Sequence, residues 1–317
     1  MSESTNNSRL CFNNEPFYSK SLNKIRQLID QMNSNDANKK LPYFSFNFLK
    51  YYTHDYLVAP SGFDAELTDL LWQFEKKNYL DKTLLIVMSD HGNRLSQYGF
   101  YTEPGRIERS MPFMSIRVPK KLHNTEFHKN IESNRNKLIS IFDIYKTLAH
   151  FKYINEFGIE PMLNQSCRHN FKQSQPEIRS MRGISLFELV ASNRTCLEAL
   201  VPSSYCLCTL KQPINEITYF NETKYSFKES GELIVDFINA MTTAYRSQCI
   251  PFTLSQVKSV KKLKYSADTW LYNVQLVLTP GESVFEANLK LDKQKKLKVY
   301  ENKVNRLSKY RQQSKVY

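Results

Sequence analysis

The sequence lacks any long apolar run. Although 41% of its 317 residues are hydrophobic, no stretch of about 18 consecutive apolar residues occurs, so no membrane span is predicted. Its first residues, MSESTNNSRLCFNNEPF, have no apolar core and do not resemble a signal peptide. Neither a C-x-x-C pair nor an internal repeat is present. What remains is a chain long enough for one large globular domain, or for a main domain with a satellite.

Charge is unevenly distributed along the chain. The net charge is +13, and the basic excess is concentrated late, in Lys258–Lys264 and Lys290–Lys315. Such a balance favours anionic partners. Tyrosines are interleaved with the lysines, so this region could bind an anionic polysaccharide or a nucleic acid. We favour the simpler interpretation of a solvated face on a small sheet, and we expect no specific nucleic acid partner.

The cysteines and glycosylation motifs point to an oxidising compartment. Four of the six cysteines fall between residues 196 and 249, a spacing typical of disulfides. Acceptor triplets for N-glycosylation begin at Asn6, Asn164, Asn193 and Asn221. Together these signals predict a secreted protein or one of the secretory pathway. Because the chain nevertheless begins without a signal peptide, we expect its first residue not to be that of a complete secreted protein.

The most informative stretch is Thr83–Gly92, TLLIVMSDHG. Its apolar, branched first half predicts a strand buried in a parallel sheet, where chemistry gathers beyond the carboxyl ends of the strands. Asp90 and His91 follow at once, and an oxygen ligand beside a nitrogen ligand suits a divalent cation. Gly92 permits a tight turn. The alternative is that Asp90 caps a turn and His91 is a surface residue.

The segments around this stretch predict alternating helices and strands. Helices are expected over residues 15–33, 61–77 and 134–150, where apolar positions recur on one face, and strands over 43–49 and 111–119. Strand 43–49, helix 61–77 and strand 83–88 would form a right-handed crossover unit. That unit would bring His54 to the same sheet edge as Asp90 and His91. The pattern favours a three-layer α/β core.

The chain after residue 190 has a different pattern. Strands are predicted over 272–278, 283–291 and 297–300, separated by Pro280-Gly281 and Asp292-Lys293, as in a small antiparallel sheet. The expected organisation is therefore an N-terminal tail and helix (1–40), a core (41–190) and a cysteine-containing, basic C-terminal region (191–317).

Four ordered segments carry a family resemblance: YFSFNFLKYYTHDYL, NYLDKTLLIVMSDHGNR, GRIERSMPFMSIRVP and SIFDIYKTLAH. In this order they resemble the alkaline phosphatase and sulfatase superfamily, and most closely its uncharacterised sulfatase-like eukaryotic branch, the domain of unknown function 229 type. The resemblance covers residues 40–150, and RGISLF with NRTCLEALVPSSYCLC extends it to about residue 210. It implies an alkaline-phosphatase-like fold.

The resemblance also implies a site. By position it assigns metal binding to Asp90 and His91, contact with the transferred group or leaving oxygen to His54, and neutralisation of a sulfate or phosphate to Arg106. The implied cofactor is a divalent ion, Ca, Mn, Mg or Zn, and the implied substrate is an anionic ester, glycan-linked esters included. Simpler roles stay open: His54 bonding a nearby backbone group, and Arg106 pairing with Glu103 or Glu108. Weaker candidates are Asp55, Asn93 and Arg94, while His123, His128, His150 and His169 are predicted surface or packing residues.

The sequence departs from the family at its N-terminal side. Members need an early strand with acidic ligands and a Thr, Ser or modified Cys nucleophile, and we find no counterpart. Cys11 lacks the sulfatase context, and Lys50 stands where two-metal phosphatases carry an acidic residue. The nucleophile is therefore unknown, and we expect no hydrolysis by the chain as it stands. Three explanations are a truncated product, which we favour, a pseudoenzyme or binding module, and a site completed by another chain.

Overall fold

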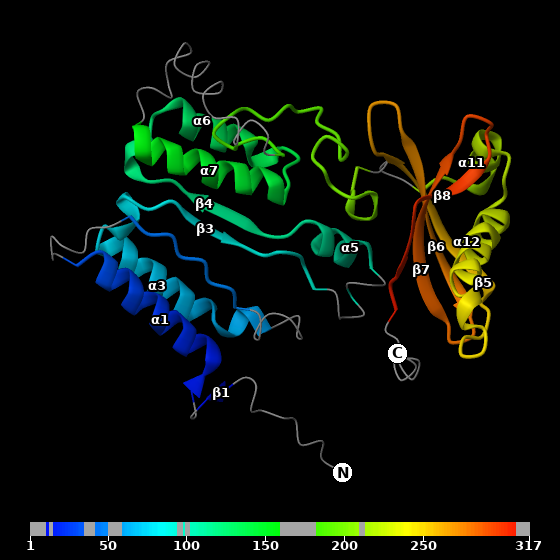
Figure 1. Ribbon diagram of the computed structural model, residues 1–317, viewed down its shortest axis with the longest axis horizontal. Coiled ribbons are helices and arrows are strands. Elements are labelled where there is room, and N and C mark those ends of the chain that lie inside the picture. Colours follow the sequence, from blue (N-terminus) through cyan, green and yellow to red (C-terminus); the bar gives the residue numbers. More distant parts are fainter. Residues whose placement is uncertain are drawn as a thin grey trace. The chain divides into compact units, whose positions relative to one another are not determined.

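A computed structural model describes residues 11–12, 15–34, 42–49, 59–93, 98, 102–158, 182–208 and 213–308 (Figure 1). The fold is mixed α/β and divides into two compact units, Met1–His123 and Asn124–Tyr317. Within the described ranges, no helix has the length and apolar character needed to cross a membrane.

Two helices build the core of the first unit. They are α1 (Phe17–Met32) and α3 (Asp64–Lys76), which confirms the helices predicted over residues 15–33 and 61–77. Leu22 and Ile29 of α1 pack with Leu70 and Phe74 of α3, because the 3.6-residue period places each pair on one face. At the edge of this contact, the Ser19 hydroxyl donates to Glu66 Oε1 at 2.8 Å.

The strand after these helices does not lie in a parallel sheet. β3 (Leu85–Met88) pairs antiparallel with β4 (Met114–Arg117), so the predicted strands exist but the predicted parallel arrangement is wrong. Residues 42–49 form no strand, and the crossover unit is therefore not formed. Phe44, Phe46 and Phe48 are 77%, 78% and 61% exposed. The apolar composition favours extended backbone, but it does not determine which other strand pairs with it through hydrogen bonds.

A helix that was not among the predicted elements lies between β3 and β4. It is α5 (Glu103–Ser110), which is capped by Thr102, whose hydroxyl accepts a hydrogen bond from Gly105 N at 3.0 Å. Pro104 lies in the first turn, where its missing N–H costs no helical hydrogen bond.

The second unit begins with α6 (Glu126–Ser133) and α7 (Ile141–Phe157). α7 starts later than the predicted residue 134, because Ser140 and Asp143 form a capping box there. His150 on this helix packs edge-on against Phe127 and Phe187, with ring centroids 5.6 and 5.4 Å apart, which confirms it as a packing residue.

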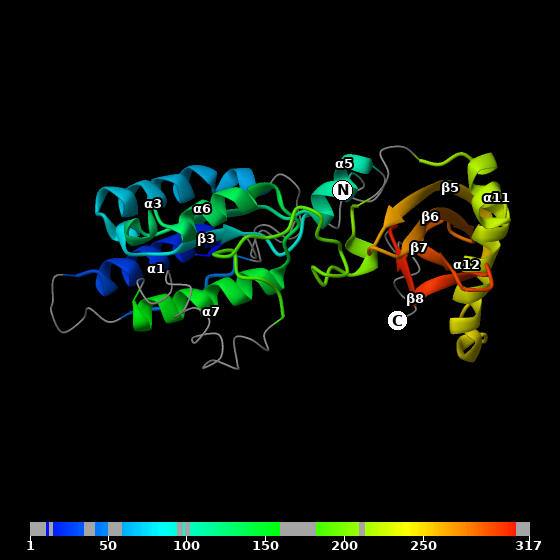
Figure 2. The ribbon, with the colours of Figure 1, turned by 90° about the horizontal axis from the view of Figure 1, so that it is seen from above.

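The predicted C-terminal antiparallel sheet is confirmed. β5 (Thr253–Lys264), β6 (Trp270–Thr279), β7 (Ser283–Leu291) and β8 (Leu297–Arg306) pair in that order, and β5 is a strand that the lysine-rich sequence concealed. α12 (Phe227–Met241), preceded by α11 (Glu216–Thr223), packs along one face of this sheet (Figure 2). A disulfide joins Cys196 to Cys206, as predicted for this cysteine-rich stretch.

The remaining elements are short. They are the strand pair β1 (Cys11–Phe12) and β2 (Glu15–Pro16) and the 3-10 helices η3 (Ala59–Gly62), η4 (Tyr79–Asp81), η5 (Lys120–Leu122), η6 (Asn134–Asn136), η7 (Ser203–Tyr205) and η8 (Thr243–Tyr245).

Candidate functional site

The SDHG turn lies directly at the carboxyl end of β3. Ser89 continues the ladder by one residue: its N–H donates to Phe113 O at 2.9 Å, and its hydroxyl accepts from Phe113 N at 3.0 Å. Asp90 then leaves the sheet with its side chain 61% exposed. The turn therefore presents its carboxylate to solvent from a position that β4 fixes.

His91 is oriented like a metal ligand. Its Nδ1 lies 2.7 Å from the Gly92 carbonyl oxygen, and because a carbonyl only accepts, Nδ1 carries the hydrogen. In the neutral imidazole the lone pair is then on Nε2, which lies 3.4 Å from Asp90 Oδ2. Two ligand atoms at ~2.1 Å from a tetrahedral ion would be about 3.4 Å apart, so the pair fits a shared cation. The backbone bond to Nδ1 is the usual orienting contact of a ligating histidine.

Gly92 allows the SDHG turn to pack against α5. Its N–H donates to Arg109 O at 3.3 Å, and a Cβ at this position would lie 2.2 Å from the Glu108 carbonyl oxygen. Only glycine allows so close an approach of two backbones. The turn with Asp90 and His91 is thus held against the helix that carries GRIERS, which the sequence linked to it only through the resemblance.

Two arginines of α5 are buried beside each other along the helix. Arg106 is 5% exposed and Arg109 is 8% exposed. Arg106 Nη1 lies 3.6 Å from Glu103 Oε1, so the pairing with Glu103 that the sequence left open does occur. Within the described ranges, Arg109 Nε has no hydrogen-bond partner. Sequence reasoning missed Arg109, although its spacing of three residues from Arg106 places both on one helical face.

Several predicted site residues lie outside the described residues. They include His54, Asp55 and Arg94, so the expected meeting of His54 with the SDHG turn remains a prediction. Across the described part of the chain, the one cluster of three or more metal-type side chains consists of cysteines, not of Asp90 and His91. A metal site with Asp90 and His91 as two of its ligands therefore remains a prediction.

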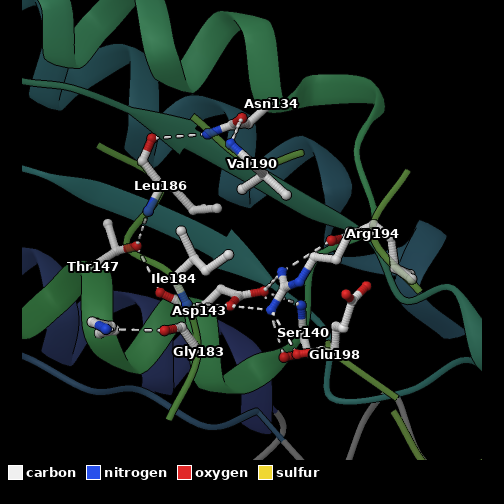
Figure 3. Close-up of polar contacts among 12 residues, drawn as sticks. Asn134, Ser140, Asp143, Thr147, Gly183, Ile184, Leu186, Val190, Arg194 and Glu198 are labelled. Atoms are coloured by element: carbon white, nitrogen blue, oxygen red, sulfur yellow. Dashed lines mark hydrogen bonds and ion pairs between the residues drawn. The ribbon is translucent and has the colours of Figure 1, made fainter. Parts of the chain in front are cut away.

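A second polar cluster explains two other family segments (Figure 3). Asp143, from SIFDIYKTLAH, accepts hydrogen bonds from Ile184 N and from Ser140 N, each at 2.7 Å. Thr147 accepts from Leu186 N at 2.8 Å, so this segment and RGISLF are joined by hydrogen bonds. Arg194 supplies two more donors to Asp143, which fills the four acceptor positions of the carboxylate. A saturated carboxylate has no lone pair left for chemistry, so this cluster is structural.

The lysines of the C-terminal sheet are engaged with aromatic rings of the same unit. Lys262 and Lys264 lie 5.0 and 5.9 Å from the Trp270 ring centroid, and Lys290 lies 5.6 Å from that of Tyr300. Lys262 also lies 3.1 Å from the Glu222 carboxylate. Because these rings are already covered by lysines, they are poor platforms for stacking a base or sugar. This favours the interpretation of a solvated basic face.

A family model described as "Protein of unknown function (DUF229)" matches residues 1–258. No curated protein and no solved structure matches the chain.

Proposed function

The chain belongs to the DUF229 family, and on that premise we propose that it carries part of a metal-dependent site for hydrolysis of a sulfate or phosphate ester. The proposal follows the resemblance to the alkaline phosphatase and sulfatase superfamily. One observation supports it above the others: the Asp90-His91 turn is fixed against α5, the helix that buries two arginines.

The donor atoms suit a divalent cation. Asp90 Oδ2 and His91 Nε2 would hold Ca, Mn, Mg or Zn, with Gly92 O fixing the histidine tautomer. When bound, such an ion polarises an anionic ester oxygen and stabilises the charge that develops during transfer.

The two arginines suit the sulfate or phosphate group of the substrate. Arg106 and Arg109 are both buried in the helix beside the turn, and Arg106 Nη1 lies 3.6 Å from Glu103 Oε1. A guanidinium offers planar pairs of donors that match a tetrahedral oxyanion. Arg109 therefore joins Arg106 as a proposed substrate-binding residue. His54 keeps its proposed role as proton donor to the leaving oxygen, and the nucleophile is not identified.

Metal titration of the intact chain tests the first half of the proposal. Calorimetry with Mn²⁺ or Zn²⁺ should give binding that Asp90→Asn weakens by at least ~10-fold, since a ligand matters no less than its supporting contacts. Asp268→Asn, an exposed carboxylate in the second unit, is the matched control and should leave the affinity unchanged. Equal affinities of the wild type and Asp90→Asn would remove Asp90 from any metal site.

Anion binding tests the second half. With Mn²⁺ present, inorganic sulfate or phosphate should bind more weakly to Arg109→Met than to the wild type. Arg246→Met, an exposed arginine of the second unit, controls for the loss of one positive charge. The alternative function, a pseudoenzyme or a binding module for anionic polymers, predicts salt-sensitive heparin binding that needs no metal and is lost when lysines of β5 and β8 are replaced.

A further inference from the structure

The sulfur atoms of three cysteines lie close together beside β5 and β6 of the C-terminal sheet. Cys196 and Cys206 form a disulfide, and the Sγ of Cys208 lies 3.5 Å from that of Cys196. All three sulfur atoms lie within 4.8 Å of one another, while Cys208 keeps a free thiol. A potential nucleophile is therefore in van der Waals contact with a disulfide sulfur.

The fold anchors the backbone of the cysteine segment at both ends. Lys264 of β5 donates its N–H to Cys208 O at 2.9 Å, and Leu197 donates to Tyr265 O at 3.2 Å, so both ends of the cysteine segment are anchored to the sheet. Cys196 and Cys206 are fully buried and pack with Leu263 and Leu271, whereas Cys208 is exposed. The exposed side chain is free to rotate toward the line of the S–S bond, which is the direction that attack on sulfur requires.

We propose that Cys196, Cys206 and Cys208 form an internal thiol–disulfide exchange site with two disulfide isomers. The Cys208 thiolate attacks Cys196 Sγ, the Cys196–Cys208 bond forms, and the Cys196–Cys206 bond breaks. Cys206 leaves as a thiolate and takes up the proton that Cys208 released. No oxidant or reductant is consumed, because one disulfide and one thiol are present before and after the step.

The exchange changes which of the two cysteines, Cys206 or Cys208, carries the free thiol. The covalent loop grows from a sequence separation of 10 to one of 12. In the first isomer the free thiol is the exposed Cys208, and in the second it is Cys206, whose position is buried. The first isomer can form a mixed disulfide with another thiol, and the second is shielded from it. The exchange thus controls whether the free thiol of this cluster is reactive.

Trapping of the free thiol in the wild-type chain tests this inference. Although the Cys208 side chain reaches solvent, partial desolvation by its neighbours raises the pKa of the thiol. The protein is therefore incubated at about pH 9 to populate the thiolate, since the usual thiol pKa is ~8.5. It is then quenched in acid, unfolded and alkylated with N-ethylmaleimide, and the labelled cysteines are located by fragmentation mass spectrometry. We expect label on both Cys206 and Cys208. Label on Cys208 with none on Cys206 would overturn the proposal.

Three variants sharpen the test. In Cys208→Ser, Cys206 should remain unlabelled; label there would show that another thiol drives the exchange and would refute the role of Cys208. Cys249→Ser is the matched control and should leave the wild-type pattern unchanged. Cys206→Ser should form the Cys196–Cys208 bond, seen as a mass two hydrogens below that of the reduced chain. A folded Cys206→Ser chain with Cys196 free would contradict the proposal, and if this variant does not fold, the wild-type labelling decides.

Discussion

The carboxylate of Asp143 and the guanidinium of Arg194 form a two-armed ion pair in the interior of the second unit. Oδ2 lies 2.7 Å from Nη1 and Oδ1 lies 3.0 Å from Nη2, while the side chains are 0% and 3% exposed. Arg194 also donates to Leu138 O at 3.1 Å, so one side chain ties the start of α7 to the segment before it and to residues 182–208. This contact links two stretches that are far apart in sequence.

Arg194→Met should therefore destabilise the second unit strongly. It leaves the buried Asp143 carboxylate without its counter-charge, a change that costs about 3–5 kcal/mol in comparable pairs. Urea unfolding followed by circular dichroism measures the loss. Arg26→Met is the matched control, because Arg26 and Asp69 form an exposed pair at 3.4 Å that contributes at most ~1 kcal/mol. Similar losses in the two variants would show that the buried pair is not a stabilising feature.

Gly183→Ala should also be strongly destabilising. Gly183 has φ +91°, and a Cβ there would lie 2.6 Å from the Phe142 carbonyl carbon and 2.7 Å from its oxygen. The variant combines backbone strain with a clash that no side-chain rotation relieves. Gly158→Ala controls for φ alone, since exposed Gly158 has φ 87° and ψ 174°, a region that is essentially restricted to glycine, and it should cost about 1–3 kcal/mol. Measured free energies of unfolding should show that Gly183→Ala is less stable than Gly158→Ala.

Removing two neighbouring tyrosine hydroxyls should have opposite effects. Tyr219 and Tyr272 pack edge to face, with ring centroids 5.3 Å apart. In the described part of the chain the buried Tyr219 hydroxyl makes no hydrogen bond of normal length, although the Ser230 and Thr223 hydroxyls lie near it, whereas that of Tyr272 donates to Glu222 Oε2 at 2.9 Å. Tyr219→Phe should leave stability unchanged or raise it, and Tyr272→Phe should lower it by ~1 kcal/mol. Thermal unfolding of both variants decides this, and equal losses would contradict it.

Alkaline pH should weaken the C-terminal sheet through Tyr219. Burial raises its pKa to about 12, above the ~10 of an unfolded tyrosine. The folded state therefore keeps a proton that the unfolded state releases, so stability is full below about pH 10 and falls as pH rises toward 12. Urea unfolding at about pH 9 and 11 should show a smaller fall for Tyr219→Phe than for the parent. Both chains should carry Cys208→Ser, so that disulfide exchange does not interfere.

Gly92→Ala should weaken metal binding although both proposed ligands remain. The added methyl would clash with the Glu108 carbonyl oxygen, so the turn must move away from α5 and the relation between Asp90 and His91 must change. Calorimetry with Mn²⁺ should show a lower affinity than in the wild type. Gly158→Ala, a glycine substitution in the other unit, should bind Mn²⁺ as the wild type does. An unchanged Mn²⁺ affinity in Gly92→Ala would mean that the packing of the SDHG turn against α5 does not contribute to metal binding.

Local sequence was enough to predict the elements whose signals lie within a few residues. The helices over 15–33 and 61–77 were predicted from apolar periodicity and are α1 and α3. Pro280-Gly281 correctly separated two strands of the C-terminal sheet. These features depend on backbone preference and on one buried face, both of which neighbouring residues determine.

Strand partners could not be predicted in the same way. The run Thr83–Met88 predicted a strand, but its pairing with β4 depends on residues nearly thirty positions away. β5 was missed because its lysines hid an alternating pattern that becomes visible only when β6 is beside it. A ladder is a contact between distant segments, and hydrophobicity does not encode its direction.

For the site, residue identity alone specifies the available chemical groups: a carboxylate and an imidazole in SDHG, arginines in GRIERS, and cysteines spaced for a disulfide. Which of these groups lie next to one another depends on the folded chain. It placed Gly92 against α5, filled the acceptor positions of Asp143 with donors from Ser140, Ile184 and Arg194, and set Cys208 beside a disulfide. The reason is physical: residue type fixes what an atom can donate, accept or attack, whereas distance and burial arise only when remote parts of the chain pack together.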